Sequence, residues 1–431
     1  MIPKELTLAK SGLFAALRRL RGNARGCVYT EPLWGIPFNL YAPYVSVYML
    51  ALGLTDSDIG LLTSIGLACQ VVWALLSGAI ADKLGRKRTT LIFDILAWSI
   101  PTLIWAVAQD FTYFLVAVIV NSAWRVTQNS WTLIMVEDTD PILLVDIYAW
   151  IHIAGLLAAF VTPLTGLLVG AFGLVSTMRG LYLLAFVMMT AKFLSMNVLV
   201  TETAQGRLRR RQTRDQSLFA VLGESPEILR QIMRSPATLY VGALMILLDI
   251  SWIVRSTFWS IYATQRLQVS DARLALYTFA RSVTMLLFFL AVTPKLRKME
   301  EWLPMLLGLG GLIASHILLI TIPPGSPWLL LLVTVLEGCS IPMTTTLLGK
   351  LVVVTVNPQE RARIMALLNV AVLLVTSPFG WIAGRLSTLD RRWPFALTAV
   401  GLAVAGLLVI WASRVRKRRE ARQQNPIPDT M

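Results

Sequence analysis

Gly78-Ala-Ile-Ala-Asp-Lys-Leu-Gly-Arg-Lys-Arg-Thr-Thr90 is a charged stretch between two apolar runs, residues 59–81 and 91–107. Each run has about 20 residues, enough to cross the roughly 30 Å hydrocarbon core of a bilayer as a helix. The stretch therefore predicts a tight turn between two membrane-spanning helices. Its two glycines, Gly78 and Gly85, are expected to permit close backbone approach or a sharp turn. Its basic residues predict that the turn lies on the cytoplasmic side.

The composition of the 431-residue chain is typical of a polytopic membrane protein. Hydrophobic residues make up 56% of it, charged residues make up 15%, and the mean hydropathy is +0.66. The net charge of +15 would also suit a nucleic-acid partner. However, most Lys and Arg fall in segments expected in the cytoplasm, as the positive-inside rule requires. Membrane topology and anionic lipids therefore explain the charge, and no nucleic-acid partner is expected.

Cofactor and enzyme chemistry have little support in the sequence. Cys27, Cys69 and Cys339 lie far apart, so they indicate neither a disulfide framework nor a metal site. Gly349-Lys350 is followed by leucine and lacks the upstream glycine of a phosphate-binding loop, so direct use of ATP is not expected. We expect no cofactor, no metal and no enzymatic activity.

The hydropathy pattern predicts an all-α membrane protein with twelve transmembrane helices in two six-helix bundles. The predicted helices span 27–52, 59–81, 89–108, 111–136, 142–170, 178–200, 237–263, 272–292, 303–322, 328–354, 363–386 and 393–412. The expected organisation is a basic amphipathic segment (1–26), an N-terminal bundle (27–200), a cytoplasmic linker (201–236), a C-terminal bundle (237–412) and a basic cytoplasmic tail (413–431). We expect it in the cell membrane, with both termini in the cytoplasm.

Two motifs resemble signatures of the major facilitator superfamily of secondary transporters. The pattern Gly78-x-x-x-Asp82-Lys-x-Gly85-Arg86-Lys resembles the family's helix 2–3 loop. Within the fourth predicted helix, Arg125-x-x-Gln128-Asn129 is similar to the family's Arg-x-x-Gln-Gly, with asparagine where glycine is usual. The resemblance implies that two bundles rock about a central site near the bilayer midplane.

The resemblance also implies a gating role for the loop motif. The implied gating residues are Gly78, Asp82, Gly85, Arg86 and Arg88. Asp82 is expected to meet the start of the eleventh helix, in the segment Asn357–Arg363, when the cytoplasmic side is closed. The basic residues are expected to contact nearby acids such as Glu137 or Asp138. The corresponding turn in the second half, residues 294–298, lacks the glycine and the acid.

Ionisable residues within the predicted helices are candidates for proton coupling, because a charge at membrane depth is costly. These candidates are Glu31, Arg125, Asp249, Arg281 and Glu337. The resemblance associates Arg125 with proton transfer. The alternative is a structural arginine whose charge and hydrogen-bond donors are satisfied by Glu31 or by backbone carbonyls. In the second half, Asp249, Arg255, Arg281 and Glu337 should face one another or a wet cavity, either as a proton-linked switch or as a permanent set of salt bridges.

Other charged residues in the helices are expected to be structural. Asp94 is expected to pair with Arg86 or Arg88, near the basic loop. Lys192 is expected to snorkel inward. His316 is expected to be structural.

Polar and aromatic residues in the same helices are candidates for substrate binding. These candidates are Trp34, Asn39, Tyr41, Gln128, Trp131, Trp252, Arg255 and Trp259. A pocket with aromatic walls and a few charges suits an amphiphilic organic molecule. Aromatic belts at the membrane interface explain many tryptophans equally well.

The sequence thus predicts a proton-coupled secondary transporter, an antiporter that exports small amphiphilic or drug-like compounds by alternating access. Its expected partners are a small-molecule substrate, protons and membrane lipids, and it is expected to be a monomer. The alternatives are uptake of an anionic metabolite or sugar, attracted by the arginines, and lipid translocation. A further alternative is a sensor or scaffold that does not transport. Loss of the charges within the helices would favour this alternative, but the charges are present.

Overall fold

The computed structural model describes residues 20–140, 143–213, 235–292, 299, 302–355 and 361–424. All regular secondary structure in these residues is helical, and ten of the helices are long and apolar enough to cross a membrane. The chain is therefore an all-helical multi-pass membrane protein, as predicted. Most of the N-terminal segment, the second part of the linker, the 294–298 turn and residues 357–360 lie outside the described residues.

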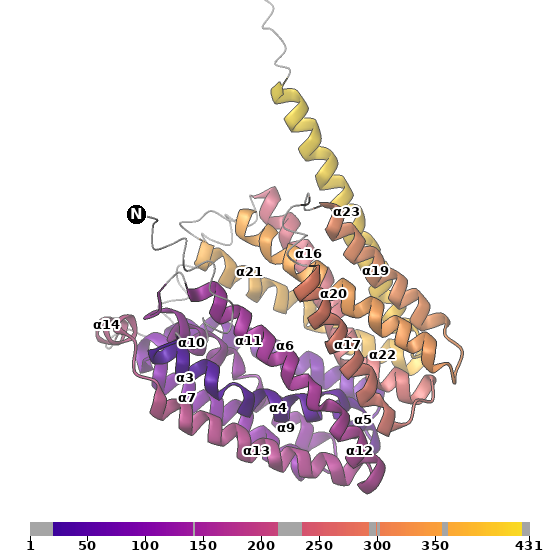
Figure 1. Ribbon diagram of the computed structural model, residues 1–431, viewed down its shortest axis with the longest axis horizontal. Coiled ribbons are helices and arrows are strands. Elements are labelled where there is room, and N and C mark those ends of the chain that lie inside the picture. The colour runs from indigo at the N-terminus through magenta and orange to yellow at the C-terminus, as the bar shows by residue number, and fades with distance from the viewer. Residues whose placement is uncertain are drawn as a thin grey trace, which may run out of the picture.

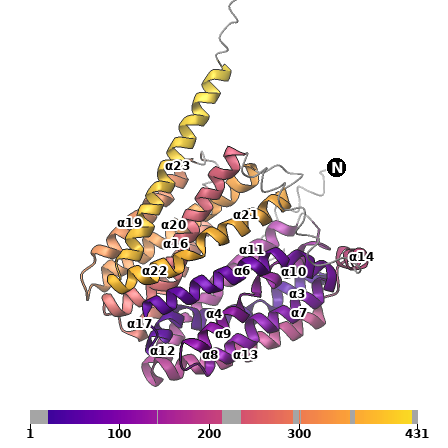
Figure 2. The same cartoon turned by 180° about the vertical axis from the view of Figure 1, so that it is seen from behind.

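The two halves of the chain form two groups of helices that lie side by side (Figure 1). The view from behind shows the same arrangement, with the indigo-to-magenta half beside the red-to-yellow half (Figure 2). We call the end with the connections at 84–86 and 199–204 the proximal end. The distal end is the opposite one, with the connections at 52–55, 173, 267–270 and 390–392.

The helices of the first half follow the predicted order. They are α3 (Gly22–Thr30), α4 (Pro32–Tyr41), η1 (Ala42–Tyr44), α5 (Val45–Ala51), α6 (Asp56–Leu84), α7 (Arg86–Asp94), η2 (Ile95–Ser99), α8 (Ile100–Ala106), α9 (Phe111–Asn121), α10 (Trp124–Val136), α11 (Leu144–Ala158), η4 (Ala159–Val161), α12 (Thr162–Phe172) and α13 (Leu174–Leu199). The short helix α14 (Ala204–Gln212) follows them at the proximal end and carries three consecutive arginines, 209–211.

The helices of the second half begin after the linker. They are α16 (Pro236–Ile261), η6 (Tyr262–Arg266), α17 (Asp271–Ala291), α19 (Trp302–Thr321), α20 (Pro327–Thr355), α21 (Arg361–Thr376), α22 (Pro378–Leu389) and α23 (Trp393–Gln424). Helix α23 runs beyond the predicted end of the twelfth helix at 412. Its last turns extend away from the bundle in both views (Figures 1 and 2).

Two predicted spans, the first and the fourth, are interrupted and are not among the ten candidates. In the first span, Pro32 starts a new helix, α4, and Pro43 lies in the single turn η1. Proline lacks the backbone N–H that a continuous helix would use. The fourth span breaks at Ser122–Ala123, between α9 and α10. The count of twelve membrane-spanning helices stays a prediction.

A cluster of buried aromatic residues anchors the broken first span at the distal end. Tyr48 donates a hydrogen bond to the carbonyl of Trp105 at 2.9 Å, and its ring packs against Tyr182 and Phe114. The rings of Tyr41 and Tyr182 lie 5.0 Å apart, and Tyr41 is only 3% exposed. Tyr41, a predicted substrate-binding residue, is therefore part of this packed core.

The two halves meet closely at the distal end because glycines remove side chains from their contact. A Cβ added to Gly60 of α6 would lie 2.4 Å from the carbonyl oxygen of Gly380 in α22. One added to Gly384 would lie 2.7 Å from the carbonyl oxygen of Asp56. Small residues of this kind let membrane helices approach and gain dispersion contacts. Helices α12 and α17 are also in contact across the halves, where Gly166 lies against the backbone of Ala272.

Candidate functional site

A small cavity in the first half gathers aromatic and charged side chains. Its volume is about 130 Å³, and we call it the tryptophan pocket. The residues that line it are Glu31, Trp34, Asp94, Trp98, Trp124, Thr127, Gln128, Trp131 and Lys192. Four of these were predicted site residues: Glu31, Trp34, Gln128 and Trp131. Their convergence requires the break between α3 and α4, because Glu31 lies at that break.

A buried lysine and two carboxylates set the charge of the tryptophan pocket. Lys192 is 5% exposed, and its Nζ lies 3.0 Å from Glu31 Oε2 and 5.6 Å from the ring centroid of Trp131. Asp94 is also 5% exposed and lies close enough to Lys192 for electrostatic attraction. With all three ionised, the residues that line the pocket carry one excess negative charge, which Arg125 beside the pocket partly offsets. Such a site attracts an additional cation or a proton.

Lys192 was expected to snorkel inward, and its Nζ pairs with Glu31. The expectation for Asp94 was wrong. Asp94 does not pair with Arg86, because Arg86 contacts Asp82 and Glu137 instead. Single residues in an apolar helix say little about which way they face, so the sequence alone did not assign Lys192 or Asp94 to the site.

Arg125 lies beside the pocket and is held by side-chain amides. Its Nε donates to Gln70 Oε1 at 2.8 Å, and its Nη1 donates to Gln128 Oε1 at 3.0 Å. Its guanidinium carbon lies 4.2 Å from the ring centroid of Trp124. Neutral amides do not cancel its charge, and Asp249 of the other half is close enough to attract it electrostatically. Gln70 had not been predicted as a partner.

The second half contains a separate buried charge cluster. Arg281 Nη1 lies 3.5 Å from Glu337 Oε2, and its guanidinium carbon lies 5.6 Å from the ring centroid of Trp259. Arg255 is close enough to interact electrostatically with both. We call Arg255, Trp259, Arg281 and Glu337 the Glu337 cluster. Three of the four charged residues expected to face one another therefore do so, whereas Asp249 accepts a hydrogen bond from Thr376 at 2.9 Å.

Glu337 is incompletely satisfied although it is fully buried. Its exposed fraction is 0%, and Oε1 has no hydrogen-bond partner in the part of the chain that the structure describes. His316, also fully buried, lies within electrostatic range of Glu337, and its Nδ1 is 2.7 Å from the carbonyl oxygen of Leu312. A buried carboxylate with a free oxygen can accept a proton without breaking an existing bond at that oxygen.

Two other substrate-binding candidates lie elsewhere. Asn39 uses its side-chain amide to donate to the carbonyl of Gly35 at 2.7 Å, within its own helix. Trp252 has 55% of its surface exposed, whereas Trp259 of the same helix is 3% exposed. The two tryptophans are seven residues apart, a spacing that places them on one face of the helix, yet one is exposed and the other is buried.

The charged loop at the proximal end is held together within the first half. Gly85 has a φ of +89°, which explains the need for glycine, and Arg86 Nη2 lies 3.2 Å from Glu137 Oε1. The expected contact with Glu137 is therefore found. Glu202 accepts hydrogen bonds from the backbone N–H groups of Arg86 (2.9 Å) and Lys87 (3.1 Å) at the start of α7.

Three further details of the motif can be placed. Glu202 was not predicted, although an acid directly after the sixth span was visible in the sequence. Gly78 lies inside α6 with open space where a Cβ would be, so the expected turn or close approach there was wrong. Asp82 contacts Arg86 of its own loop, and Arg88 is exposed. Most of the segment expected to meet Asp82, residues 357–360 in particular, lies outside the described residues.

Comparison with known protein families gives one match that extends across the chain. The sequence profile of the Major Facilitator Superfamily matches residues 34–377 and 244–429. Among curated proteins, Quinolone resistance protein NorA of Staphylococcus aureus is 32% identical over 82 residues. That similarity covers 19% of this chain and 21% of the relative.

Solved structures share the fold at low sequence identity. The nucleoside transporter NupG has a TM-score of 0.69 at 16% identity, and the similarity covers 90% of this chain and 98% of that one. The human organic anion transporter MFSD10 has a TM-score of 0.59 at 18% identity, with 94% and 100% covered. A bacterial homolog of the human lysosomal transporter Spinster has a TM-score of 0.64 at 15% identity, with 91% and 96% covered.

Proposed function

Because the chain belongs to the major facilitator superfamily, we propose that it is a proton-coupled secondary transporter that exports small amphiphilic compounds by alternating access. The main support for this proposal is the composition of the tryptophan pocket. Its four indole rings give an apolar, polarisable wall, and its two acids exceed its one lysine. An amphiphilic molecule with a positive charge satisfies both features, since aromatic faces attract cations. The short similarity to a quinolone resistance protein points the same way.

The Glu337 cluster is the proposed site of proton coupling. Protonation of Glu337 would weaken its attraction for Arg281, which is 22% exposed at its side chain while the acid is fully buried. The freed guanidinium could then turn toward water or toward the other half. Glu31 offers the same chemistry in the first half, where a proton and a cationic substrate would compete for the excess negative charge.

We place the proximal end of the molecule in the cytoplasm of a cell membrane. The support is the positive charge there, including the three consecutive arginines of α14 and the basic loop after α6. The distal end then faces outward. Its contacts between α6 and α22 and between α12 and α17 close that end, where an N-terminal bundle, residues 27–200, meets a C-terminal bundle, residues 237–412.

A pH measurement in proteoliposomes tests this function. Purified protein is reconstituted with a pH indicator inside, a pH gradient is imposed, and cationic dyes or matched anionic compounds are added. Export by proton exchange predicts a pH change with cationic dyes that is lost in Glu31→Gln. The absence of any pH change with both classes of compound would contradict the proposal.

Uptake of an organic anion is the second candidate function. It is favoured by the Glu337 cluster, which holds two arginines and one acid and is therefore positive when all three are ionised. A pH response to anionic compounds only, lost in Arg255→Gln and retained in Glu31→Gln, would support uptake over export.

A further inference from the structure

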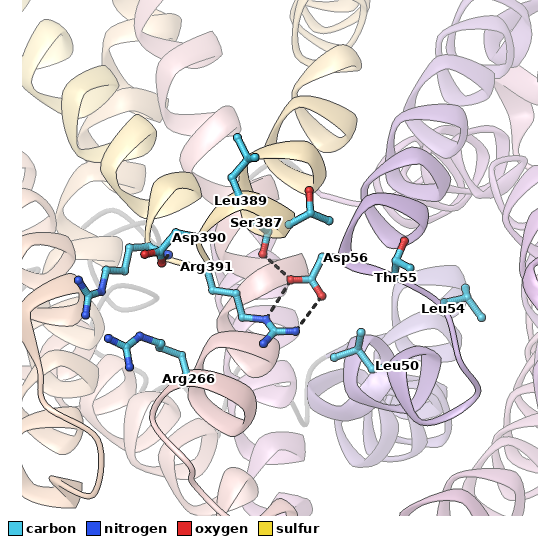
Figure 3. A pocket seen from close by; sticks show the side chains of 11 residues that line it. Leu50, Leu54, Thr55, Asp56, Arg266, Ser387, Leu389, Asp390 and Arg391 are labelled. Atoms are coloured by element: carbon cyan, nitrogen blue, oxygen red, sulfur yellow. Dashed lines mark hydrogen bonds and ion pairs between the residues drawn. The ribbon is translucent and has the colours of Figure 1, made fainter.

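A cavity of about 660 Å³ lies at the distal end, where the two halves meet (Figure 3). One wall comes from the start of α6 and the segment before it, including Asp56. The other wall comes from the end of η6 and from the connection between α22 and α23. The cavity shares no lining residue with the tryptophan pocket. We call it the distal vestibule.

The distal vestibule carries more positive than negative charge. Its ionisable residues are Asp56, Arg266, Asp390, Arg391 and Arg392. Asp56 accepts hydrogen bonds from Arg391 Nε at 3.1 Å and Nη2 at 3.3 Å and from Ser387 Oγ at 2.6 Å. Asp390 accepts from the backbone N–H of Arg392 at 2.9 Å. Counted together, three arginines face two aspartates, so one positive charge is left over.

Arg266 and Arg392 both lack a carboxylate partner for the guanidinium among the described residues, and of the two Arg266 is the more buried. Among the described residues its guanidinium has no hydrogen bond or ion pair, and Figure 3 shows none to the side chains drawn. It is nevertheless half-buried, at the end of the π-helical turn η6. A guanidinium offers five N–H donors in a planar fork that matches carboxylate and phosphate oxygens. A carboxylate or a phosphate therefore matches the donors that Arg266 offers to the vestibule.

We propose that the distal vestibule binds a small anion bearing a carboxylate or phosphate group, held by Arg266 and shared with Arg391. Arg391 is also the arginine that links the second half to Asp56 of the first half. Asp56 is 5% exposed, so a carboxylate that loses this arginine is left buried with only the Ser387 hydroxyl. The anion competes with Asp56 for Arg391 and thereby favours separation of α6 from α22. Anion binding at this end promotes its opening.

The same chemistry has two sources, a free anion in the outer medium and the headgroup of an acidic lipid. A cysteine at Ser64 reports opening, because Ser64 Oγ accepts a hydrogen bond from the backbone N–H of Trp381 at 2.7 Å across the closed contact. The reporter Ser64→Cys is made in a protein whose three native cysteines are replaced by alanine. Its labelling by a membrane-impermeant maleimide is measured in phosphatidylcholine vesicles, with inorganic phosphate or with sodium chloride at equal ionic strength.

Phosphate is expected to raise the labelling rate by about two- to fivefold over chloride, the size expected for loss of one partly exposed ion pair. Arg266→Gln abolishes the increase. The matched control is Arg273→Gln, an exposed arginine at the same end that lines a different cavity, and it retains the increase. The measurement needs no transported substrate, so failure of the proposed export would leave it interpretable.

Phosphatidylglycerol vesicles decide the source of the anion. If they raise the rate in chloride alone, and Arg266→Gln reverses this, the bound group is a lipid headgroup. If only phosphate acts, and acts in both lipids, it is a free anion. Equal rates under all four conditions overturn the proposal, as does an effect that Arg273→Gln removes and Arg266→Gln leaves. Equal thermal stability of the two Gln variants confirms that the comparison concerns folded protein.

Discussion

Lys192 is the one cation among the residues that line the tryptophan pocket, and it faces both Glu31 and Asp94. Burial removes the water that would otherwise stabilise each of these charges. The positive charge of the lysine therefore stabilises two carboxylates whose burial would otherwise be unfavourable. The indole rings of Trp34 and Trp131 lie within 6 Å of its ammonium group and add cation–π attraction.

Substitution of Lys192 should therefore damage stability more than its single ion pair suggests. Lys192→Met is expected to cost about 3–5 kcal/mol, because removing one partner leaves a buried carboxylate unpaired. Adding Glu31→Gln should recover part of that loss, since the orphaned charge is then removed. The measurement is thermal unfolding in detergent of the single and double variants. Additive losses in the double variant would show that the two residues do not interact.

Glu337 provides a test that separates folding from coupling. Glu337→Gln keeps the shape of the side chain and removes a fully buried charge whose Oε1 has no partner among the described residues. We expect the unfolding temperature to fall, because Arg281 and Arg255 are left without the carboxylate that they share. Substrate binding should persist, whereas the substrate-driven pH change in proteoliposomes should be lost. A variant that still moves protons would exclude Glu337 as the coupling residue.

At this scale the sequence predicted the buried charges better than their partners. Depth within an apolar run follows from counting residues, so Arg281 and Glu337 were recognised as costly charges that should meet. Partners depend on how helices rotate and pack against each other, which a single sequence does not show. Lys192, Asp94 and Gln70 were therefore assigned wrongly or overlooked, and Asp249 was expected beside arginines of its own half.

At the scale of helices, the contact between α6 and α22 depends on glycine. A methyl group at Gly60 would meet the carbonyl oxygen of Gly380 at 2.4 Å, and backbone cannot move aside as a flexible side chain would. Gly78 of the same helix has nothing within 4 Å of the corresponding position. The two glycines therefore differ only in what surrounds them.

Gly60→Ala should open the distal end, whereas Gly78→Ala should not. Overpacking at Gly60 is expected to cost about 1–3 kcal/mol in the closed state. Gly78→Ala should be neutral or slightly stabilising, because alanine favours a helix. Maleimide labelling of Ser64→Cys measures both. Equal labelling of the two alanine variants would mean that the helices separate without regard to this contact.

Helix positions were well predicted from hydropathy, and helix continuity was not. The starts of α9 and α17 lie within one residue of the predicted starts. The first span breaks at Pro32 and Pro43, and proline is a residue whose effect on a helix can be read from the sequence. Neither residue at the Ser122–Ala123 break is a proline or a glycine, so the local sequence did not predict the break. Tertiary packing decides such breaks.

For the whole molecule, alternating access requires that each end have its own closing contacts. The distal end is joined across the halves by Asp56 with Arg391 and by Tyr44, whose hydroxyl donates to the carbonyl of Asp271 at 3.0 Å. At the proximal end, Asp82 contacts Arg86 within its own loop. The family resemblance assigns Asp82 a contact with the start of the eleventh helix when the proximal end closes, and residues 357–360 of that segment lie outside the described residues.

Neutralising the two acids should therefore shift the equilibrium in opposite directions. Asp56→Asn weakens distal closure, so the distally open population should rise about two- to fivefold, as expected for one partly exposed pair. Asp82→Asn weakens proximal closure and should lower that population. The double variant should return toward the original balance, because the two free-energy changes oppose each other in one two-state equilibrium. Cysteine accessibility at both ends measures this. If Asp82→Asn and the parent protein label equally at the proximal end, Asp82 does not hold that end closed, and the two acids do not act on one shared equilibrium.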